Sequence, residues 1–178
     1  MKIVIEKVKR QQFDFSEEQP ASHYPSLAEM EKESGCSFSA PVSSQVSALW
    51  EYDHVRATGS VTSAVRLCCS RCLAEYEVPL SSEFTVFYTE SAGDGLEEEV
   101  ELSDVELISA SYKGEEIDLD FEIAEQVMLE VPFKPLCSES CLGLCTQCGA
   151  DLNVGECGCD RDGINMKMVA LRKIRIEK

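Results

Sequence analysis

The sequence has few histidines and few basic residues for its length. Its 178 residues include two histidines, His23 and His54, and 16 lysines and arginines against 33 acidic residues. A catalytic zinc site keeps one coordination position open and usually has histidine or carboxylate ligands, so two isolated histidines do not favour it. The sequence also lacks a glycine-rich phosphate loop and a serine or cysteine nucleophile with a supporting histidine pattern. We therefore predict that the protein is not an enzyme and has no small-molecule substrate.

Long apolar segments are also absent. No apolar run reaches the roughly 20 residues that a membrane-spanning helix needs. Residues 1–10 carry charges every few positions, where a signal peptide would have an apolar region. These absences predict a cytoplasmic protein with no membrane partner. Because cysteines stay reduced in that compartment, a disulfide framework is disfavoured.

Cysteine, in contrast, is abundant, with ten residues in the chain. Cys69 and Cys72 form an isolated CxxC motif, and six more cysteines lie within residues 137–159. Two thiolates separated by two residues on a tight turn can bind one tetrahedral zinc ion, and Gly149 after the second CxxC suits such a turn. Proximity predicts one or two zinc ions per chain, held by a local site of Cys145, Cys148, Cys157 and Cys159, and by a cross-chain site of Cys69, Cys72, Cys137 and Cys141. An interleaved pairing and a thiol redox role stay open as alternatives, and Cys36 is interpreted as a thiol outside both sites.

The negative charge is concentrated in one part of the chain. The formal net charge is −17, and residues 91–130 contain 14 acidic residues and one basic residue, Lys113. Such a field repels nucleic acid and attracts basic partners, and no RNA-recognition signature is present. Candidate contacts for a basic partner are Glu97, Glu98, Glu99 and Glu101. Candidate contacts for RNA, or counter-charges for a zinc–thiolate cluster, are Arg66, Arg71, Lys134, Arg172 and Lys173.

The middle of the chain predicts long strands. Apolar and polar residues alternate at period two over Val46–Tyr52, Val55–Leu67 and Tyr76–Tyr88. An apolar stripe at helical spacing follows, comprising Phe121, Ala124, Val127, Met128 and Val131, and it ends at Pro132. The expected fold class is α+β, with an antiparallel β-sheet or partial barrel covered by this helix and a C-terminal zinc-ribbon-like cysteine cluster.

Shorter elements complete the expected layout. We predict a strand over Lys2–Val8, a loop over Gln11–Pro25 and a helix over Ser26–Glu33 with Ser26 as its N-cap. Val105–Tyr112 and Ile117–Leu119 are interpreted as a short hairpin around Lys113-Gly114. The expected division is a β-rich core over residues 1–136, which includes the Cys69/Cys72 turn, and a metal-binding segment with a C-terminal helix over residues 137–178.

Several motifs together resemble those of a known family. They are CSRCLAEYEVP at 69–79, VPFKPLC at 131–137, CLGLCTQCGADLN at 141–153 and CGC at 157–159. From about Val55 to the C-terminus the chain resembles the YceD family, the large ribosomal RNA subunit accumulation proteins, which are bacterial and plastid-borne. The resemblance implies a non-enzymatic factor that supports rRNA accumulation or ribosome assembly by binding a basic ribosomal protein, an assembly factor or pre-rRNA of the large subunit. The alternatives are a zinc-stabilised protein–protein interaction module unrelated to RNA, and a thiol redox protein.

Overall fold

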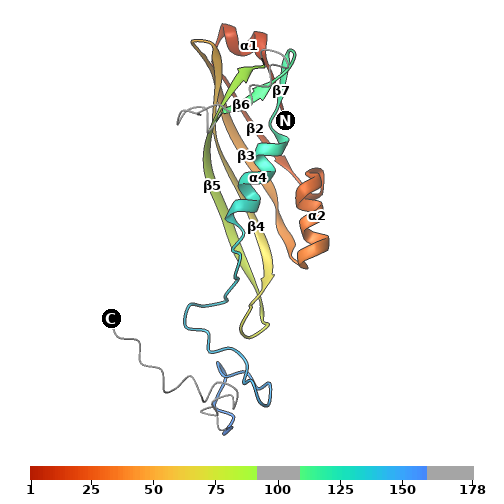
Figure 1. The fold of residues 1–178 in the computed structure, drawn as a ribbon, viewed down its shortest axis with the longest axis vertical. Coiled ribbons are helices and arrows are strands. Elements are labelled where there is room, and N and C mark those ends of the chain that lie inside the picture. The colour runs from red at the N-terminus through yellow and green to blue at the C-terminus, as the bar shows by residue number, and fades with distance from the viewer. Residues whose placement is uncertain (92–108, 160–178) are drawn as a thin grey trace, which may run out of the picture.

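A long, mixed β-sheet forms the body of the molecule (Figure 1). The computed structural model describes residues 1–91 and 109–159. The five-stranded sheet has the order β2 (Phe13–Gln19), β3 (Ser37–Glu51), β4 (His54–Cys68), β5 (Glu75–Glu90) and β6 (Ser109–Tyr112). A separate two-stranded sheet pairs β1 (Lys2–Val4) with β7 (Glu116–Asp118). The α+β class is confirmed.

The central hairpin follows the alternation in the sequence. β4 and β5 pair antiparallel without a register shift, from His54 opposite Thr89 to Cys68 opposite Glu75. Every second side chain of β4 faces the core, where Val55, Val61 and Val65 are almost completely buried. Because the opposite face carries polar residues, a one-residue slip would expose the whole apolar set, so this pattern fixes the register.

The antiparallel expectation holds only for part of the sheet. β2, β3, β4 and β5 are antiparallel neighbours, whereas β6 pairs parallel with β5, Phe87 lying opposite Ser109. β2 and β6 lie at opposite ends of the strand order. The expected hairpin around Lys113-Gly114 is wrong, because β6 joins the large sheet while β7 pairs with β1, Ile117 lying opposite Ile3.

Within residues 1–91 and 109–159, four helical elements accompany the sheets: α1 (Ile5–Arg10), the 3-10 helix η1 (Ala21–His23), α2 (Pro25–Ser34) and α4 (Asp120–Glu130). α4 crosses one face of the sheet and contacts β4 and β5 (Figure 1). Its buried residues are Ile123, Ala124 and Val127. The expected stripe was therefore partly wrong, because Phe121 is 69% exposed and Met128 is 39% exposed.

Replacing Ile123 with alanine tests how α4 is anchored to the sheet. The Ile123 side chain is fully buried, so the change should lower the free energy of unfolding by about 2–5 kcal/mol through lost burial and the cavity that remains. Phe121→Ala is the matched control in the same helix, and its effect should stay within about 0.5 kcal/mol because Phe121 is mostly exposed. Denaturant unfolding measures both. Equal losses would contradict the observed orientation of the helix.

The N-terminal part differs from the sequence-based expectation. The strand expected over Lys2–Val8 divides into β1 and α1, and the loop expected over Gln11–Pro25 contains β2. In β2 the side chains of Phe13 and Phe15 pack against the core cluster, although the strand is otherwise polar. α2 is present as expected, but Pro25 occupies its first turn and no side chain caps it, so Ser26 is not the N-cap.

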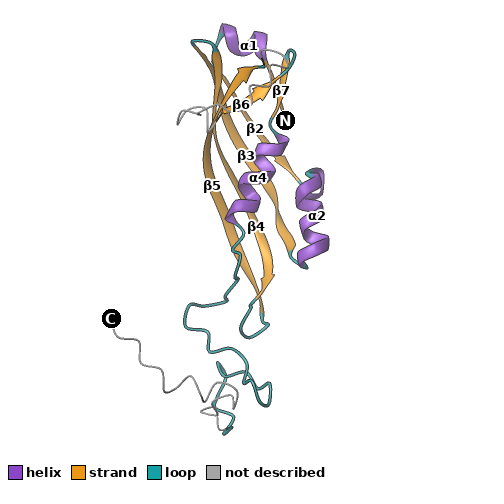
Figure 2. Ribbon diagram, in the orientation of Figure 1, coloured by secondary structure: helices purple, strands orange, loops and turns teal. Residues whose placement is uncertain are grey.

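The cysteine-rich segment lies beyond the turn that connects β4 to β5. Residues 131–159 run from the end of α4 past the hairpin turn and are drawn mostly as loop (Figure 2). The expected boundary at residue 137 stays a prediction, and the expected C-terminal helix lies outside the described residues. None of the helices in the described ranges is long and apolar enough to cross a membrane.

Candidate metal centres

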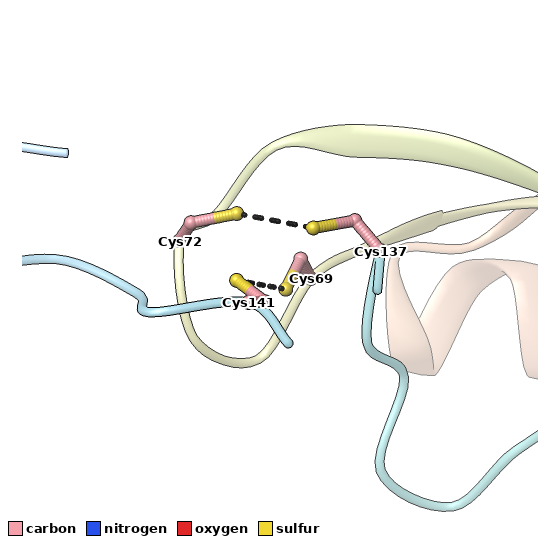
Figure 3. Close-up of side chains that lie close together, drawn as sticks. All are labelled: Cys69, Cys72, Cys137 and Cys141. Atoms are coloured by element: carbon pink, nitrogen blue, oxygen red, sulfur yellow. Dashed lines mark hydrogen bonds between the residues drawn. The ribbon is translucent and has the colours of Figure 1, made fainter. Parts of the chain in front are cut away.

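The first cysteine group joins two segments that are far apart in the chain. Cys69 and Cys72 lie on the turn that connects β4 to β5, and Cys137 and Cys141 come from the segment after α4 (Figure 3). The Sγ atoms of Cys69 and Cys141 are 3.8 Å apart, and those of Cys72 and Cys137 are 3.6 Å apart. We call this group the first tetrad.

These distances suit a tetrahedral ion. Four sulfurs at about 2.3 Å from zinc lie about 3.8 Å from one another, because that is the edge of the corresponding tetrahedron. All four Sγ atoms of the first tetrad lie within 4.8 Å of one another. Cys69, Cys72 and Cys141 are buried, so three of the four donors are already shielded from water. The first tetrad could therefore hold a metal ion.

Backbone hydrogen bonds shape the turn that carries Cys69 and Cys72. The N–H of Cys69 donates to the Ala74 carbonyl, and the N–H of Leu73 donates to the Cys69 carbonyl, both over 2.9 Å. Leu73 adopts a left-handed conformation, with φ of +61°. The N–H of Ser70 donates to the Pro135 carbonyl over 2.9 Å, which fixes the segment before Cys137 against the hairpin.

Arg71 forms hydrogen bonds between the β4–β5 turn and the segment that follows α4. Its guanidinium Nη1 donates to the carbonyl oxygens of Cys141 at 2.7 Å and Glu139 at 3.3 Å. Its backbone carbonyl accepts the N–H of Leu144 at 3.0 Å, and its own N–H donates to the Cys69 sulfur at 3.4 Å. The candidate role of Arg71 as a partner contact stays a prediction, and the structure assigns its side chain to positioning the first tetrad.

Gly143 and Asn153 are functional residues that sequence reasoning missed. Gly143 has φ of +76°, and a Cβ at this position would lie 2.9 Å from the Arg71 carbonyl oxygen. The Asn153 amide donates to the Cys141 sulfur at 3.5 Å, while its Oδ1 accepts the Leu142 N–H at 2.8 Å. The LGL and DLN motifs beside the cysteines could have indicated these two roles. Glycine permits close approach of two backbone segments, and an asparagine side chain can form hydrogen bonds both to sulfur and to the backbone.

The second cysteine group is local, as the spacing predicted. The Sγ atoms of Cys145, Cys148, Cys157 and Cys159 lie within 4.8 Å of one another. The Cys145 N–H donates to Ala150, the Gly149 N–H donates back to Cys145, both over 2.8 Å, and Gly149 has φ of +74°. A bridge between Leu144 and Asp151 closes this turn. We call this group the second tetrad, and it too could hold a metal ion.

The thiols of each tetrad differ strongly in acidity. Backbone hydrogen bonds with Cys137 and Cys72 lower the pKa of Cys69 to about 6, whereas hydrogen bonds with the Cys72 and Cys141 side chains raise the pKa of Cys137 to about 12. In the second tetrad, backbone hydrogen bonds with Cys148 and Gln147 lower the pKa of Cys145 to about 6. Hydrogen bonds with the Cys148 and Cys157 side chains raise the pKa of Cys159 to about 12. Four adjacent thiols resist complete ionisation on their own, and a bound cation reverses that preference.

The two remaining cysteines lie outside the tetrads. Cys36 is buried, and its sulfur accepts a hydrogen bond from the Ser34 hydroxyl at 3.1 Å. Cys68 is exposed at the end of β4, where its thiol donates to the Leu73 carbonyl at 3.2 Å. Cys68 directly precedes the ligand candidate Cys69 and yet belongs to neither group, which makes it a matched control for substitutions in the first tetrad.

The other candidate contacts are dispersed. Arg66 is exposed on β4 opposite Glu77 of β5. Lys134 is exposed in the segment before Cys137. Neither His23, which lies 3.2 Å from an Asp120 oxygen, nor His54 belongs to a metal-capable group within residues 1–91 and 109–159. Glu97, Glu98, Glu99, Glu101, Arg172 and Lys173 lie outside the described residues.

The fold and the site together define a class of protein: an α+β protein with two cysteine tetrads that could hold metal, the first of which is built partly on the turn of its long β4–β5 hairpin. Comparison with family models gives its identity at the family level. The model for large ribosomal RNA subunit accumulation protein YceD matches residues 57–175. The chain belongs to the YceD family, as its motifs predicted.

Individual relatives come from bacteria and plants. An uncharacterised Mycobacterium tuberculosis protein is 38% identical over 102 residues, covering 55% of this chain and 45% of its own length. The chloroplastic large ribosomal RNA subunit accumulation protein YCED homolog 1 of Arabidopsis thaliana is 26% identical over 147 residues, covering 68% of this chain and 44% of its own. The Zea mays protein of the same name is 26% identical over 131 residues, covering 59% and 44%. The chain thus spans less than half the length of these relatives, and no solved structure matches it.

Proposed function

We propose that this protein is a non-enzymatic factor that supports accumulation of the large-subunit ribosomal RNA by binding a basic ribosomal component. The observation that carries the proposal is membership of the YceD family, whose description names this role. The plant relatives carry the same description together with a chloroplastic location. A cytoplasmic location for this chain stays a prediction from its sequence.

The charge distribution favours a protein partner over direct contact with RNA. The net charge is −17, and affinity for RNA depends on phosphates neutralised by basic side chains. Arg71, which lies between the first tetrad's Cys69 and Cys72, donates from its guanidinium to backbone carbonyls. A basic ribosomal protein or assembly factor is therefore the proposed partner, and pre-rRNA is the second choice.

Zinc in both tetrads is part of the proposal. Four cysteine donors in a tetrahedral arrangement fill the coordination of zinc and leave no position for a substrate, which is typical of structural sites. In the first tetrad the ion would join the β4–β5 turn to the segment after α4. This arrangement supports a role in holding an interaction surface in shape and is one reason to propose a protein without catalytic activity.

A thiol redox role is the second candidate. The lowered pKa of Cys69 and Cys145, each the first cysteine of a CxxC motif, is the observation that favours it. The two candidates differ in metal content. Two zinc ions per chain after purification under reducing conditions would support the structural role, and reversible disulfides within metal-free tetrads would support the redox role.

Reversing the acidic cluster tests the proposed partner. Changing Glu97, Glu98, Glu99 and Glu101 to lysine should weaken binding to purified basic proteins of the large subunit by at least about tenfold, because it removes the field that attracts them. In cells that depend on the variant, the ratio of large- to small-subunit rRNA should fall.

The matched control reverses four acidic residues of the exposed sheet face, Asp14, Glu18, Glu75 and Glu83, which changes the net charge equally. If the control variant lost binding to the same extent, the attraction would depend on the total charge of the protein and not on the acidic segment. Unchanged binding and an unchanged rRNA ratio in the test variant would rule out the acidic segment as the partner site.

A further inference from the structure

A groove runs between α2 and α4 and continues to the segment before Cys137. It consists of two cavities of about 360 and 400 Å³ that share Met30, Ser34 and Met128 as lining residues. We call it the α2–α4 groove. Its deeper part is lined mostly by apolar groups, among them Leu67, Val131 and Pro132. It belongs to neither tetrad, although Cys68 at its end directly precedes Cys69.

Large apolar side chains are exposed along this groove. Two of the lining residues are among them: Phe133 is fully exposed and Met128 is 39% exposed. Isolated exposed apolar residues are ordinary, but two in the lining of one apolar groove form a patch of the kind that marks an interaction site. No part of the described chain covers Phe133.

The backbone on both sides of Phe133 is held by hydrogen bonds. The N–H of Val131 donates to the Met128 carbonyl at 3.2 Å, and the Pro135 carbonyl accepts the Ser70 N–H at 2.9 Å, so hydrogen bonds hold the chain on both sides of Phe133. Pro132 and Pro135 restrict the backbone between these points. An aromatic side chain has only two side-chain torsions, and on a restrained backbone it loses little conformational freedom on binding, which suits an interface anchor.

The rim of the groove is acidic. Glu29 and Glu33 of α2 line one of the two cavities, and Glu125 is exposed on α4, three residues before the lining residue Met128. Lys32 and Lys134 are the basic residues nearby in sequence. An apolar groove with methionines in its walls and acidic residues on its rim is complementary to a helix with an apolar stripe and flanking lysines or arginines.

We propose that the α2–α4 groove binds a basic amphipathic helix of a protein partner, with Phe133 as its anchor. The inference deepens the proposed function, on which it rests, because it assigns the basic partner a binding mode and a place. Apolar residues at positions i, i+3, i+4 and i+7 of the bound helix would enter the groove, and basic residues would face Glu29 and Glu33.

The test uses the full chain, loaded with zinc, and a synthetic 18-residue peptide of leucine and lysine with leucines at helical spacing. Fluorescence anisotropy measures its binding. A peptide of the same composition with the leucine stripe scrambled serves as the control for charge alone. We expect the patterned peptide to bind at least about tenfold more tightly than the scrambled one. Equal binding of both peptides would show general attraction to an acidic surface and would overturn the proposal.

Substitutions locate the site. Phe133→Ala should weaken binding of the patterned peptide by about tenfold or more without loss of zinc or stability, because the side chain is fully exposed. Tyr52→Asn is the control, since Tyr52 is 96% exposed in the β3–β4 turn, at the other end of β4 from the groove. Replacing Glu29 and Glu33 together with glutamine should weaken binding and reduce its dependence on salt.

Two further results would overturn the inference. One is unchanged peptide affinity in Phe133→Ala. The other is an absence of peptide binding to the full chain, whether the groove stays empty or holds another segment of the same chain. The rRNA ratio is measured separately in cells. A protein that binds the peptide through Phe133 but has no effect on that ratio would contradict the proposed function and leave the groove assignment intact.

Discussion

Replacing Cys69 with serine is expected to reduce the bound zinc from two ions per chain to one. Serine oxygen is a poor substitute for a thiolate, and three remaining sulfurs leave the tetrahedral site incomplete. Structural zinc binding is worth about 10–16 kcal/mol in small zinc domains, so its loss should release the segment after α4 from the β4–β5 turn. The core sheet, which is held by apolar contacts, should persist.

Metal analysis and thiol titration measure this outcome together. With zinc in the second tetrad alone, five thiols of the variant should be without metal, namely Cys36, Cys68, Cys72, Cys137 and Cys141. Amide hydrogen exchange should increase around Arg71 and Leu144, whose hydrogen bond depends on the junction. Exchange in the middle of β4 and β5 should stay slow.

Cys68→Ser is the matched control because it removes the neighbouring, exposed thiol. It should retain two zinc ions and the exchange pattern of the unmodified protein. A Cys69→Ser protein that still held two ions would contradict the assignment of Cys69 as a ligand. Loss of both ions would indicate either that the two tetrads fold together or that they share ligands. Shared ligands would be the interleaved pairing that spacing alone left open.

Gly143→Ala is expected to have the second largest effect on zinc binding, although Gly143 is not a candidate ligand. An alanine at φ of +76° is strained, and its Cβ would lie 2.9 Å from the Arg71 carbonyl oxygen, so the 141–144 segment must move away from the turn. The shift would pull Cys141 out of the first tetrad and break the Leu144 to Arg71 hydrogen bond. We expect zinc affinity at this tetrad to fall by roughly 100-fold, equivalent to about 3 kcal/mol.

Gly149→Ala separates backbone strain from the steric overlap. Gly149 has nearly the same φ, +74°, but a Cβ there meets nothing within 4 Å. The alanine should weaken zinc binding at the second tetrad by roughly tenfold, in line with an energy of about 1–2 kcal/mol for the left-handed conformation. Competition with a chelator resolves the release of each ion. Equal effects of the two substitutions would mean that the approach to Arg71 contributes nothing.

The parts of the fold that were predicted well from the sequence are those that local patterns determine, namely strand alternation and cysteine spacing. Strict alternation over residues 55–67 fixed both the face and the register of β4, since a sheet with one buried face tolerates no slip. The second tetrad followed from spacing because all of its cysteines lie within 15 residues. The first tetrad was predicted because Cys69 and Cys72 form a CxxC motif, and Cys137 and Cys141 are the cysteines of the 137–159 cluster that lie outside the second tetrad.

The errors fall where distant residues decide the structure. β2 lies at one end of the described strand order and consists mostly of polar residues, and it is a strand because it pairs with β3 and because Phe13 and Phe15 pack against the core. β6 and β7 are separated by three residues and could have formed a hairpin, but Tyr88 of β5 and Ile3 of β1 supply their actual neighbours. The α2–α4 groove depends on the packing of two helices nearly a hundred residues apart, which no local pattern encodes.

The pairing of β1 with β7 sets an order of events during synthesis. Lys2 lies opposite Asp118, so the first strand has no partner until more than a hundred further residues have left the ribosome. At 5–20 residues per second this takes roughly 6–23 s. The β3–β4–β5 meander consists of neighbours in sequence and can form within that time. Ile3 therefore lacks its strand partner Ile117 until β7 has been made, and the first tetrad can close only after the growing chain has extended beyond Cys141.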